Sequence, residues 1–122
     1  MFCDDEILSS GFVSFCMACI SRKGGNPEKD PIMSPLIAPD FIMRLLPQTQ
    51  IVVSEIDGLR DHTYAMALRL IKAGVPVHVH EMADFIHGWC NMDTNGFGVN
   101  EFRRATMLVC SILEEMFARG QE

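Results

Sequence analysis

Residues 51–82 read IVVSEIDGLRDHTYAMALRLIKAGVPVHVHEM, and this stretch decides the fold. Its opening is a short, continuous, β-branched run, as expected for a strand buried on both faces of a parallel sheet. Asp61 then offers an N-cap for a helix at residues 62–73, which ends at Gly74. Tyr64, Leu68 and Ile71 mark its expected apolar stripe, with Ala67 beside them. Residues 75–82 alternate valine with other residues, which predicts a second strand. This order implies a right-handed parallel crossover, so the sequence predicts an α/β fold.

The predicted second strand has two different faces. Its valines share one face, whereas Pro76, His78 and His80 share the other, so the second face is expected to be the wetter one. A proline near the start of a strand is typical of a sheet edge, where its missing N–H is not needed. Two histidines on one strand face also suggest zinc ligands, but no third ligand is evident from the sequence. Solvation at the sheet edge is the simpler explanation of the two histidines.

The segments that flank this unit are predicted to be helical or extended. Residues 7–20 form an apolar helix, and the breaker Gly-Gly-Asn-Pro at residues 24–27 follows it as the candidate linker. Three prolines spaced four residues apart end at Pro39, which favours extended or turn structure before a short helix at residues 40–46. Asn100 is expected to cap a closing helix. The apolar face of that helix is expected to consist of Phe102, Met107, Leu108, Ile112, Leu113, Met116 and Phe117.

The composition is that of an ordinary globular chain with one domain. It has 122 residues, of which 48% are hydrophobic and 21% charged, and a formal net charge of −6. This acidic balance argues against a nucleic-acid partner, because phosphate binding needs clustered Lys and Arg. The acidic N-terminus lacks the basic opening of a signal peptide, and the apolar run at residues 11–20 is too short for a transmembrane helix. We therefore expect a soluble, cytoplasmic chain.

The five cysteines do not form the regular, even-numbered framework of a secreted disulfide-rich protein. Cys16 and Cys19 match the C-x-x-C pattern of redox and zinc sites. They lie inside an apolar stretch, however, whereas a reactive thiol needs an exposed, electropositive setting. A buried core helix is therefore the favoured interpretation of this motif, and we expect neither a metal nor a cofactor.

Two residues follow the predicted strands directly, at the edge where open α/β sheets place catalytic groups. They are Asp57, after the first strand, and His87, after the second. Adjacent parallel strands lie about 4.8 Å apart, so we expect the carboxylate within about 2.6–3.2 Å of an imidazole nitrogen. Such an Asp fixes the tautomer and leaves the other nitrogen facing a nucleophile. Taken singly, each has a simpler interpretation, as the end of a strand and as a loop histidine.

Three motifs resemble those of hormone-sensitive-lipase-like α/β hydrolases. Residues 30–40, DPIMSPLIAPD, are similar to the stretch before the acid-bearing strand of that family. Asp57-x-Leu-x-Asp61 resembles the Asp-Pro-Leu-x-Asp loop, whose first Asp is the triad acid. His87-Gly-Trp89 resembles His-Gly-Phe, whose His is the triad base, and the order Asp then His agrees with Ser…Asp…His. The resemblance implies that Asp57 and His87 are catalytic, whereas Asp61 remains a helix cap.

The same resemblance implies the fold, the domains and the reaction. The expected fold is the C-terminal β-α-β-α portion of an α/β-hydrolase sheet, an incomplete three-layer sandwich. Residues 1–29 are then an N-terminal apolar helix with a Gly/Pro linker, and residues 30–122 are the C-terminal part of the catalytic domain. The implied reaction is hydrolysis of a carboxylic ester or acylglycerol by a lipase or esterase. Phe85 and Trp89 either border an acyl pocket or only cover the base of the loop.

The sequence departs from the family pattern at two places. Gly58 replaces the proline, which loosens the loop that holds Asp57. No serine has a glycine two positions before and two positions after it, and Gly24-Gly25 lacks the His-Gly-Gly context of the family's oxyanion hole. Without a nucleophile the acyl-enzyme route is closed, so the chain alone is expected to be inactive. The alternative is a non-catalytic, hydrolase-derived interaction module that binds a partner or a second copy through an exposed sheet edge.

Overall fold

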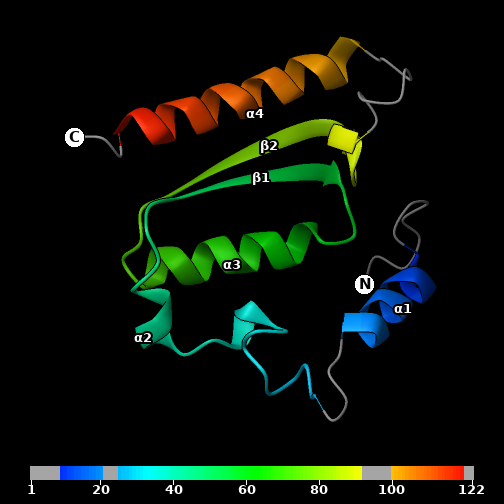
Figure 1. Ribbon diagram of the computed structural model, residues 1–122, viewed down its shortest axis with the longest axis vertical. Helices are drawn as coiled ribbons and strands as arrows, with labels where there is room; N and C mark the ends of the chain where they lie inside the picture. Colours follow the sequence, from blue (N-terminus) through cyan, green and yellow to red (C-terminus); the bar gives the residue numbers. More distant parts are fainter. Residues whose placement is uncertain (1–8, 21–24, 92–99, 120–122) are drawn as a thin grey trace.

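A two-stranded parallel sheet forms the centre of the structure, a computed structural model (Figure 1). Its strands are β1 (Thr49–Ile56) and β2 (Val77–Ile86). The parallel register is unbroken until Ser54, which lies opposite Met82. The structure describes three stretches of the chain, namely residues 9–20, 25–91 and 100–119.

Helices cover both faces of this sheet. Helix α3 (Arg60–Lys72) joins the strands and packs on one face, while helix α4 (Asn100–Arg119) lies over the other (Figure 1). The parallel pairing of two strands joined by a helix confirms the predicted α/β fold. The remaining elements are α1 (Ser10–Ile20), η1 (Pro35–Ile37), α2 (Asp40–Met43) and η2 (Trp89–Asn91).

The two faces of the sheet are covered unequally. Ile51 and Val77 pack against the buried core beneath α3. Val52 points to the opposite face, because side chains alternate along a strand, and it remains 36% exposed there. The prediction that this β-branched run is buried on both faces therefore holds only for the face under α3.

Four buried apolar residues make the core beneath α3. Met43 and Leu70 are each 1% exposed, and Val75 and Ala38 adjoin them. Leu70 comes from α3, and the predicted stripe of this helix is wrong at Leu68 and Ile71, which are 57% and 53% exposed because the face that meets the core is that of Ala67 and Leu70. Met43 is the last residue of α2, a helix shorter than the one predicted at residues 40–46. This core joins the proline-rich segment, the crossover helix and the approach to β2 into one unit.

Arg69 of α3 fastens the proline-rich segment to this core. Its guanidinium donates to the backbone carbonyls of Leu36 and Ala38 and to the carboxylate of Asp40. The contacts with Ala38 and Asp40 measure 2.7 Å. The planar fork of an arginine suits several fixed acceptors at once, so one side chain holds the segment between η1 and α2.

Helix α3 begins at Arg60, and the prediction that Asp61 is its N-cap is wrong. The Leu59 N–H donates to Oδ1 of Asp57 at 2.8 Å, and the Arg60 N–H donates to the backbone carbonyl of Asp57 at 3.0 Å. Asp61 lies exposed in the first turn. Leu59 takes the N-cap position, and its side chain makes no capping hydrogen bond. The turn that Asp57 closes after β1 starts the helix before the chain reaches Asp61.

Only part of the predicted apolar face of α4 points inward. Phe102, Ala105 and Val109 pack with Met82 and Trp89 in a second core. The predicted face also contained four residues that remain 47–73% exposed, namely Met107, Leu108, Leu113 and Phe117. The predicted face was too wide because α4 is apolar on more than one side, whereas only one stripe at helical spacing meets the rest of the molecule.

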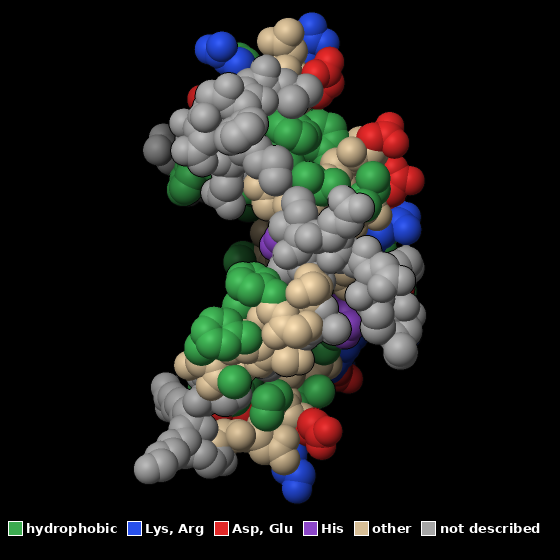
Figure 2. Space-filling view, turned by 90° about the vertical axis from the view of Figure 1, so that its right-hand side faces the viewer, with side chains coloured by type: hydrophobic (Ala, Val, Ile, Leu, Met, Phe, Trp, Pro, Cys, Tyr) green, Lys and Arg blue, Asp and Glu red, His purple; other side chains and the backbone are tan. Residues whose placement is uncertain are grey.

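Helix α1 leaves its apolar side chains exposed. Its two phenylalanines are more than half exposed, and Figure 2 shows hydrophobic side chains gathered on the surface at the level of this helix. Cys16 is half-buried and Cys19 exposed, so the prediction of a buried core helix is wrong, because no other described element packs closely on α1. Residues 7–8 and Gly24, parts of the predicted helix and linker, lie outside the described residues.

Within residues 9–20, 25–91 and 100–119, no helix combines the length and the hydropathy that a bilayer crossing requires.

Replacing Leu70 by Ala is expected to lower the free energy of unfolding by about 2–5 kcal/mol, because it leaves a cavity in the core beneath α3. Leu68 is 57% exposed on the same helix, and Leu68→Ala, the matched control, should change the value by less than about 0.5 kcal/mol. Urea unfolding followed by circular dichroism measures both variants. Equal losses for the two would contradict the packing of α3 against the sheet.

Candidate active site

Asp57 and His87 meet at the carboxyl ends of the two strands. Asp57 directly follows β1, and His87 directly follows β2. Nδ1 of His87 lies 2.9 Å from Oδ2 of Asp57, which confirms the predicted contact between carboxylate and imidazole. The Asp57 side chain is 13% exposed and the His87 side chain 36%. The carboxylate is therefore shielded, while the ring keeps a side that faces solvent.

The two oxygens of the Asp57 carboxylate have different partners. Oδ1 accepts the Leu59 N–H at 2.8 Å, while Oδ2 faces His87. The first contact is an Asx-turn, in which an Asp side chain binds the backbone two residues further on. This turn spans Gly58 and opposes the loosening expected from a glycine in the place of the family's proline. The hydrogen bond to Leu59 fixes one oxygen of the carboxylate, and the other oxygen faces the imidazole.

An irregularity in β2 sets the place from which His87 emerges. β1 advances by two residues, from Ser54 to Ile56, while β2 advances by four. Asp84 lies in this bulge with a φ of 61°, and its N–H donates to the Glu55 carboxylate at 2.9 Å. Bulges bend a strand and re-aim the side chains beyond them, and they are common beside active sites.

The chemistry of the pair follows from its donors and acceptors. An ionised carboxylate only accepts hydrogen bonds, so Nδ1 of His87 carries the proton in its contact with Asp57. The neutral ring then has its lone pair on Nε2. A histidine held in this tautomer can take a proton from a hydroxyl group, and the carboxylate stabilises the imidazolium that results. The pair has the properties of a general base with an orienting acid.

The aromatic residues beside His87 belong to the second core. Trp89 is 5% exposed, and its ring lies edge-on to Phe85 with the ring centres 5.1 Å apart. Phe85 also packs against Phe102 of α4 at 5.2 Å between ring centres. Of the two roles that the sequence allowed, the structure therefore favours covering the base of the loop. These contacts anchor the backbone on both sides of His87.

An exposed polar cluster, not predicted from the sequence, ties the start of α3 to β2. Arg60 donates to the Glu81 carboxylate at 2.8 Å and 3.2 Å, and its guanidinium carbon lies 5.6 Å from the centre of the Tyr64 ring. Hydrogen bonds from Tyr64 and Arg60 lower the pKa of Glu81. Exposed pairs of this kind contribute little to stability. The i, i+4 spacing of Arg60 and Tyr64 was visible in the sequence, but the third member comes from the neighbouring strand.

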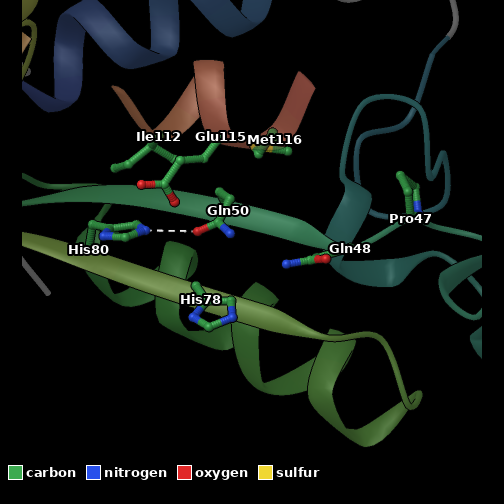
Figure 3. Close-up of a pocket in the computed structure, with 8 residues that line it drawn as sticks. All are labelled: Pro47, Gln48, Gln50, His78, His80, Ile112, Glu115 and Met116. Atoms are coloured by element: carbon green, nitrogen blue, oxygen red, sulfur yellow. Dashed lines mark hydrogen bonds between the residues drawn. The ribbon is translucent and has the colours of Figure 1, made fainter. Parts of the chain in front are cut away.

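A cavity of about 420 Å³ lies at the other end of the strands, between the sheet and α4 (Figure 3). His78 and His80 line it from β2, and Nε2 of His80 lies 2.8 Å from Oε1 of Gln50. The prediction that this face of β2 is solvated at a sheet edge holds for His78, which is exposed, whereas His80 is half-buried rather than fully solvated, because α4 lies over it. Gln50 and Asp57 are roughly 20 Å apart along the strand, so the cavity is separate from the candidate active site.

In the part of the chain that the structure describes, no three His, Cys, Asp or Glu side chains gather closely enough to hold a metal ion.

The family of the alpha/beta hydrolase fold matches residues 2–91, which include both Asp57 and His87. The chain belongs to this family. The matched range begins well before residue 30, where the motifs recognisable in the sequence start, and it ends before α4. The two strands and the helix α3 that joins them therefore belong to an α/β-hydrolase fold.

This α/β-hydrolase chain is similar to a deacetylase-like protein and to a lipase over about half of its length. It is 49% identical to arylacetamide deacetylase-like 3 of Homo sapiens over 59 residues, which are 48% of this chain and 14% of that protein. It is 38% identical to hormone-sensitive lipase of Homo sapiens over 64 residues, which are 52% of this chain and 6% of that protein. These similarities confirm the resemblance to hormone-sensitive-lipase-like hydrolases.

A solved esterase shares the fold of the hydrolase chain. The thermostable esterase from Pseudomonas putida ECU1011 superposes with a TM-score of 0.74 at 25% identity, over 86% of this chain and 32% of that one. The chain therefore spans about a third of the solved esterase, and smaller shares of the two human proteins.

Asp57→Ala is expected to lower the free energy of unfolding by about 0.5–1.5 kcal/mol, the usual contribution of one hydrogen bond, because the Leu59 N–H loses its acceptor. Asp57→Asn keeps a side-chain oxygen for Leu59 and should lose less. Asp61→Ala is the matched control, with an expected change below about 0.5 kcal/mol because Asp61 is exposed. Denaturant unfolding compares the three variants. A larger loss for Asp61→Ala would show that Asp61 is the cap after all.

Proposed function

We propose that this chain provides the acid and the base of a serine-esterase triad that hydrolyses carboxylic esters. The observation that carries the proposal is the 2.9 Å contact between Asp57 and His87, beyond the carboxyl ends of parallel strands. Catalytic groups of open α/β sheets collect at this edge. Membership of the hydrolase family and similarity to a lipase and a deacetylase-like protein support the reaction class.

In the proposed reaction, His87 acts through the ring nitrogen that does not contact Asp57. Nε2 removes the proton of a serine hydroxyl while the serine oxygen attacks the ester carbonyl. Asp57 stabilises the imidazolium, which then gives the proton to the leaving alkoxide as the acyl-enzyme forms. Water, deprotonated by the same nitrogen, then attacks the acyl carbon; the bond to the serine oxygen breaks, the imidazolium returns the proton to that oxygen, and the carboxylic acid leaves.

The nucleophile and the oxyanion hole come, in this proposal, from outside these 122 residues, because no Gly-x-Ser-x-Gly occurs among them. Residues 30–122 are the C-terminal part of a catalytic domain, and residues 1–29 are an apolar helix and linker joined to it. The chain by itself has no acyl-enzyme route and is inactive as an esterase. The solvent-facing side of His87 is the place where the missing serine is expected.

The proposed substrate is an ester or an acylglycerol with an aliphatic acyl group. Similarity to proteins named as a lipase and a deacetylase-like protein supports an acyl derivative of this kind. The proposed compartment is the cytoplasm. Four cysteines in the described ranges are free, which agrees with a reducing environment.

The exposed edge of β1 favours a second candidate, a hydrolase-derived interaction module. Among the described residues β1 pairs only with β2, so its other edge has no strand beside it. Val52 and Ile56 are 36% and 52% exposed on this strand. Apolar side chains next to an unpaired edge favour association with another chain or with a second copy. Ester hydrolysis by a longer protein that supplies the serine would support the first candidate and not this one.

The test of the first candidate joins residues 30–122 to the upstream part of the Pseudomonas putida esterase, on whose fold the chain superposes. The isolated chain should not hydrolyse short-chain aryl esters above the level of a serine-free protein. The joined protein should hydrolyse them, and a serine-directed inhibitor should abolish this activity. His87→Asn and Asp57→Asn should each lower kcat by roughly 10⁴-fold or more, as removal of triad members does elsewhere.

The control variant for this assay is His78→Asn, since His78 lines the cavity at the far end of the strands and should not affect kcat. Two outcomes would contradict the proposed function. One is a joined protein that folds but remains inactive, and the other is activity that survives His87→Asn.

A further inference from the structure

Glu55 precedes Asp57 by two residues and makes a contact of its own with the segment that leads to His87. Oε2 of Glu55 accepts the N–H of Asp84 at 2.9 Å. Asp84 lies in the bulge of β2, three residues before His87. The carboxylates of Glu55, near the end of β1, and of Asp57, just after it, therefore both contact the end of β2 or the residue that follows it. Asp57 contacts the imidazole itself, and Glu55 contacts the backbone that carries it.

The backbone of Asp84 adopts a conformation that needs support. Its φ of 61° lies in the left-handed region, which residues with a side chain adopt infrequently and at some energetic cost. A residue in a bulge also loses its regular partner in the hydrogen-bond ladder. Glu55 provides an acceptor for the displaced N–H, and a charged oxygen makes a stronger hydrogen bond than a neutral one.

The bulge determines whether His87 can face Asp57. From Met82 to Ile86, β2 advances by four residues where β1 advances by two. Side chains alternate in direction along a strand, so loss of one residue from the bulge would turn the following side chains to the opposite face of the sheet. A contact that stabilises the bulge therefore also stabilises the position of the imidazole.

We propose that Glu55 is a positioning residue for the candidate active site, which acts by holding the Asp84 bulge that aims His87 at Asp57. This inference rests on the proposed function of the pair. Glu55 acts through its oxygen as an acceptor of the Asp84 N–H, and Asp57 then fixes the tautomer of the ring.

A purely electrostatic role of Glu55 is the alternative explanation. The hydrogen bond to Glu81 raises the pKa of Arg60, and the negative charge of the exposed Glu55 adds to this effect. A role through charge is lost in Glu55→Gln, whereas a role as hydrogen-bond acceptor survives it, because glutamine keeps a side-chain oxygen. The conservative variant therefore separates the two roles.

Proton NMR of the ¹⁵N-labelled 122-residue chain reports the pair directly. A ring N–H that donates to a carboxylate gives a low-field signal, which His87→Asn assigns by removing it. We expect this signal in the unsubstituted chain and in Glu55→Gln, and a several-fold loss of intensity in Glu55→Ala. Glu81→Ala, the matched control, removes an exposed carboxylate of β2 that binds Arg60, and it should leave the signal unchanged.

A second substitution tests whether the effect passes through the bulge. Asp84→Gly, added to Glu55→Ala, should restore the signal, because glycine adopts a φ of 61° without steric cost. The double variant also decides the question if Glu55→Ala alone fails to fold.

Three results would overturn the inference: full signal in Glu55→Ala, loss of the signal in Glu55→Gln, or no recovery in the double variant. Each of them leaves the signal of the unsubstituted chain, and thus the proposed function, intact. Absence of the signal from the folded, unsubstituted chain would instead overturn the contact between Asp57 and His87 on which both proposals rest.

Discussion

Parallel pairing of β1 with β2 is the constraint on which the remaining structure depends. Parallel strands end at the same edge of a sheet, so Asp57 and His87 are neighbours although they lie 30 residues apart in the chain. An antiparallel pair would send the two residues to opposite edges. Parallel pairing also requires a crossover connection, and α3 serves as that connection while its buried Leu70 closes the core beneath the sheet.

Asp57 and His87 are each held in place by contacts other than the one between their two side chains. On the acid side, the Asx-turn from Asp57 to the Leu59 N–H fixes the carboxylate and starts α3 at the same time. On the base side, the bulge at Asp84 and the buried ring of Trp89 hold the chain before and after His87. A general base needs such fixed geometry, because proton transfer depends on distance and orientation. Local folding and the proposed chemistry thus rely on the same few hydrogen bonds.

Sequence reasoning succeeded where one signal acted alone. Valine alternation and the residues that follow the two strands were enough for the crossover and for the contact between Asp57 and His87, whereas the predicted stripe of the connecting helix was wrong. Sequence reasoning also failed at the start of α3, because Asp61 suits a cap by residue type, whereas the turn that Asp57 closes puts Leu59 at the N-cap. The solvation of His80 depended on where α4 lies, a long-range fact with no local pattern. The bulge was invisible because an aspartate, not a glycine, takes the positive φ.

The tautomer of His87 is the most direct test of the pair as an acid and a general base. The ¹⁵N chemical shifts of the two ring nitrogens distinguish a protonated nitrogen from one with a free lone pair. In the folded chain with the ring neutral, we expect the proton on Nδ1 and the lone pair on Nε2, because the carboxylate of Asp57 lies 2.9 Å from Nδ1. A proton on Nε2 with an unprotonated Nδ1 would contradict the pairing of Asp57 with His87.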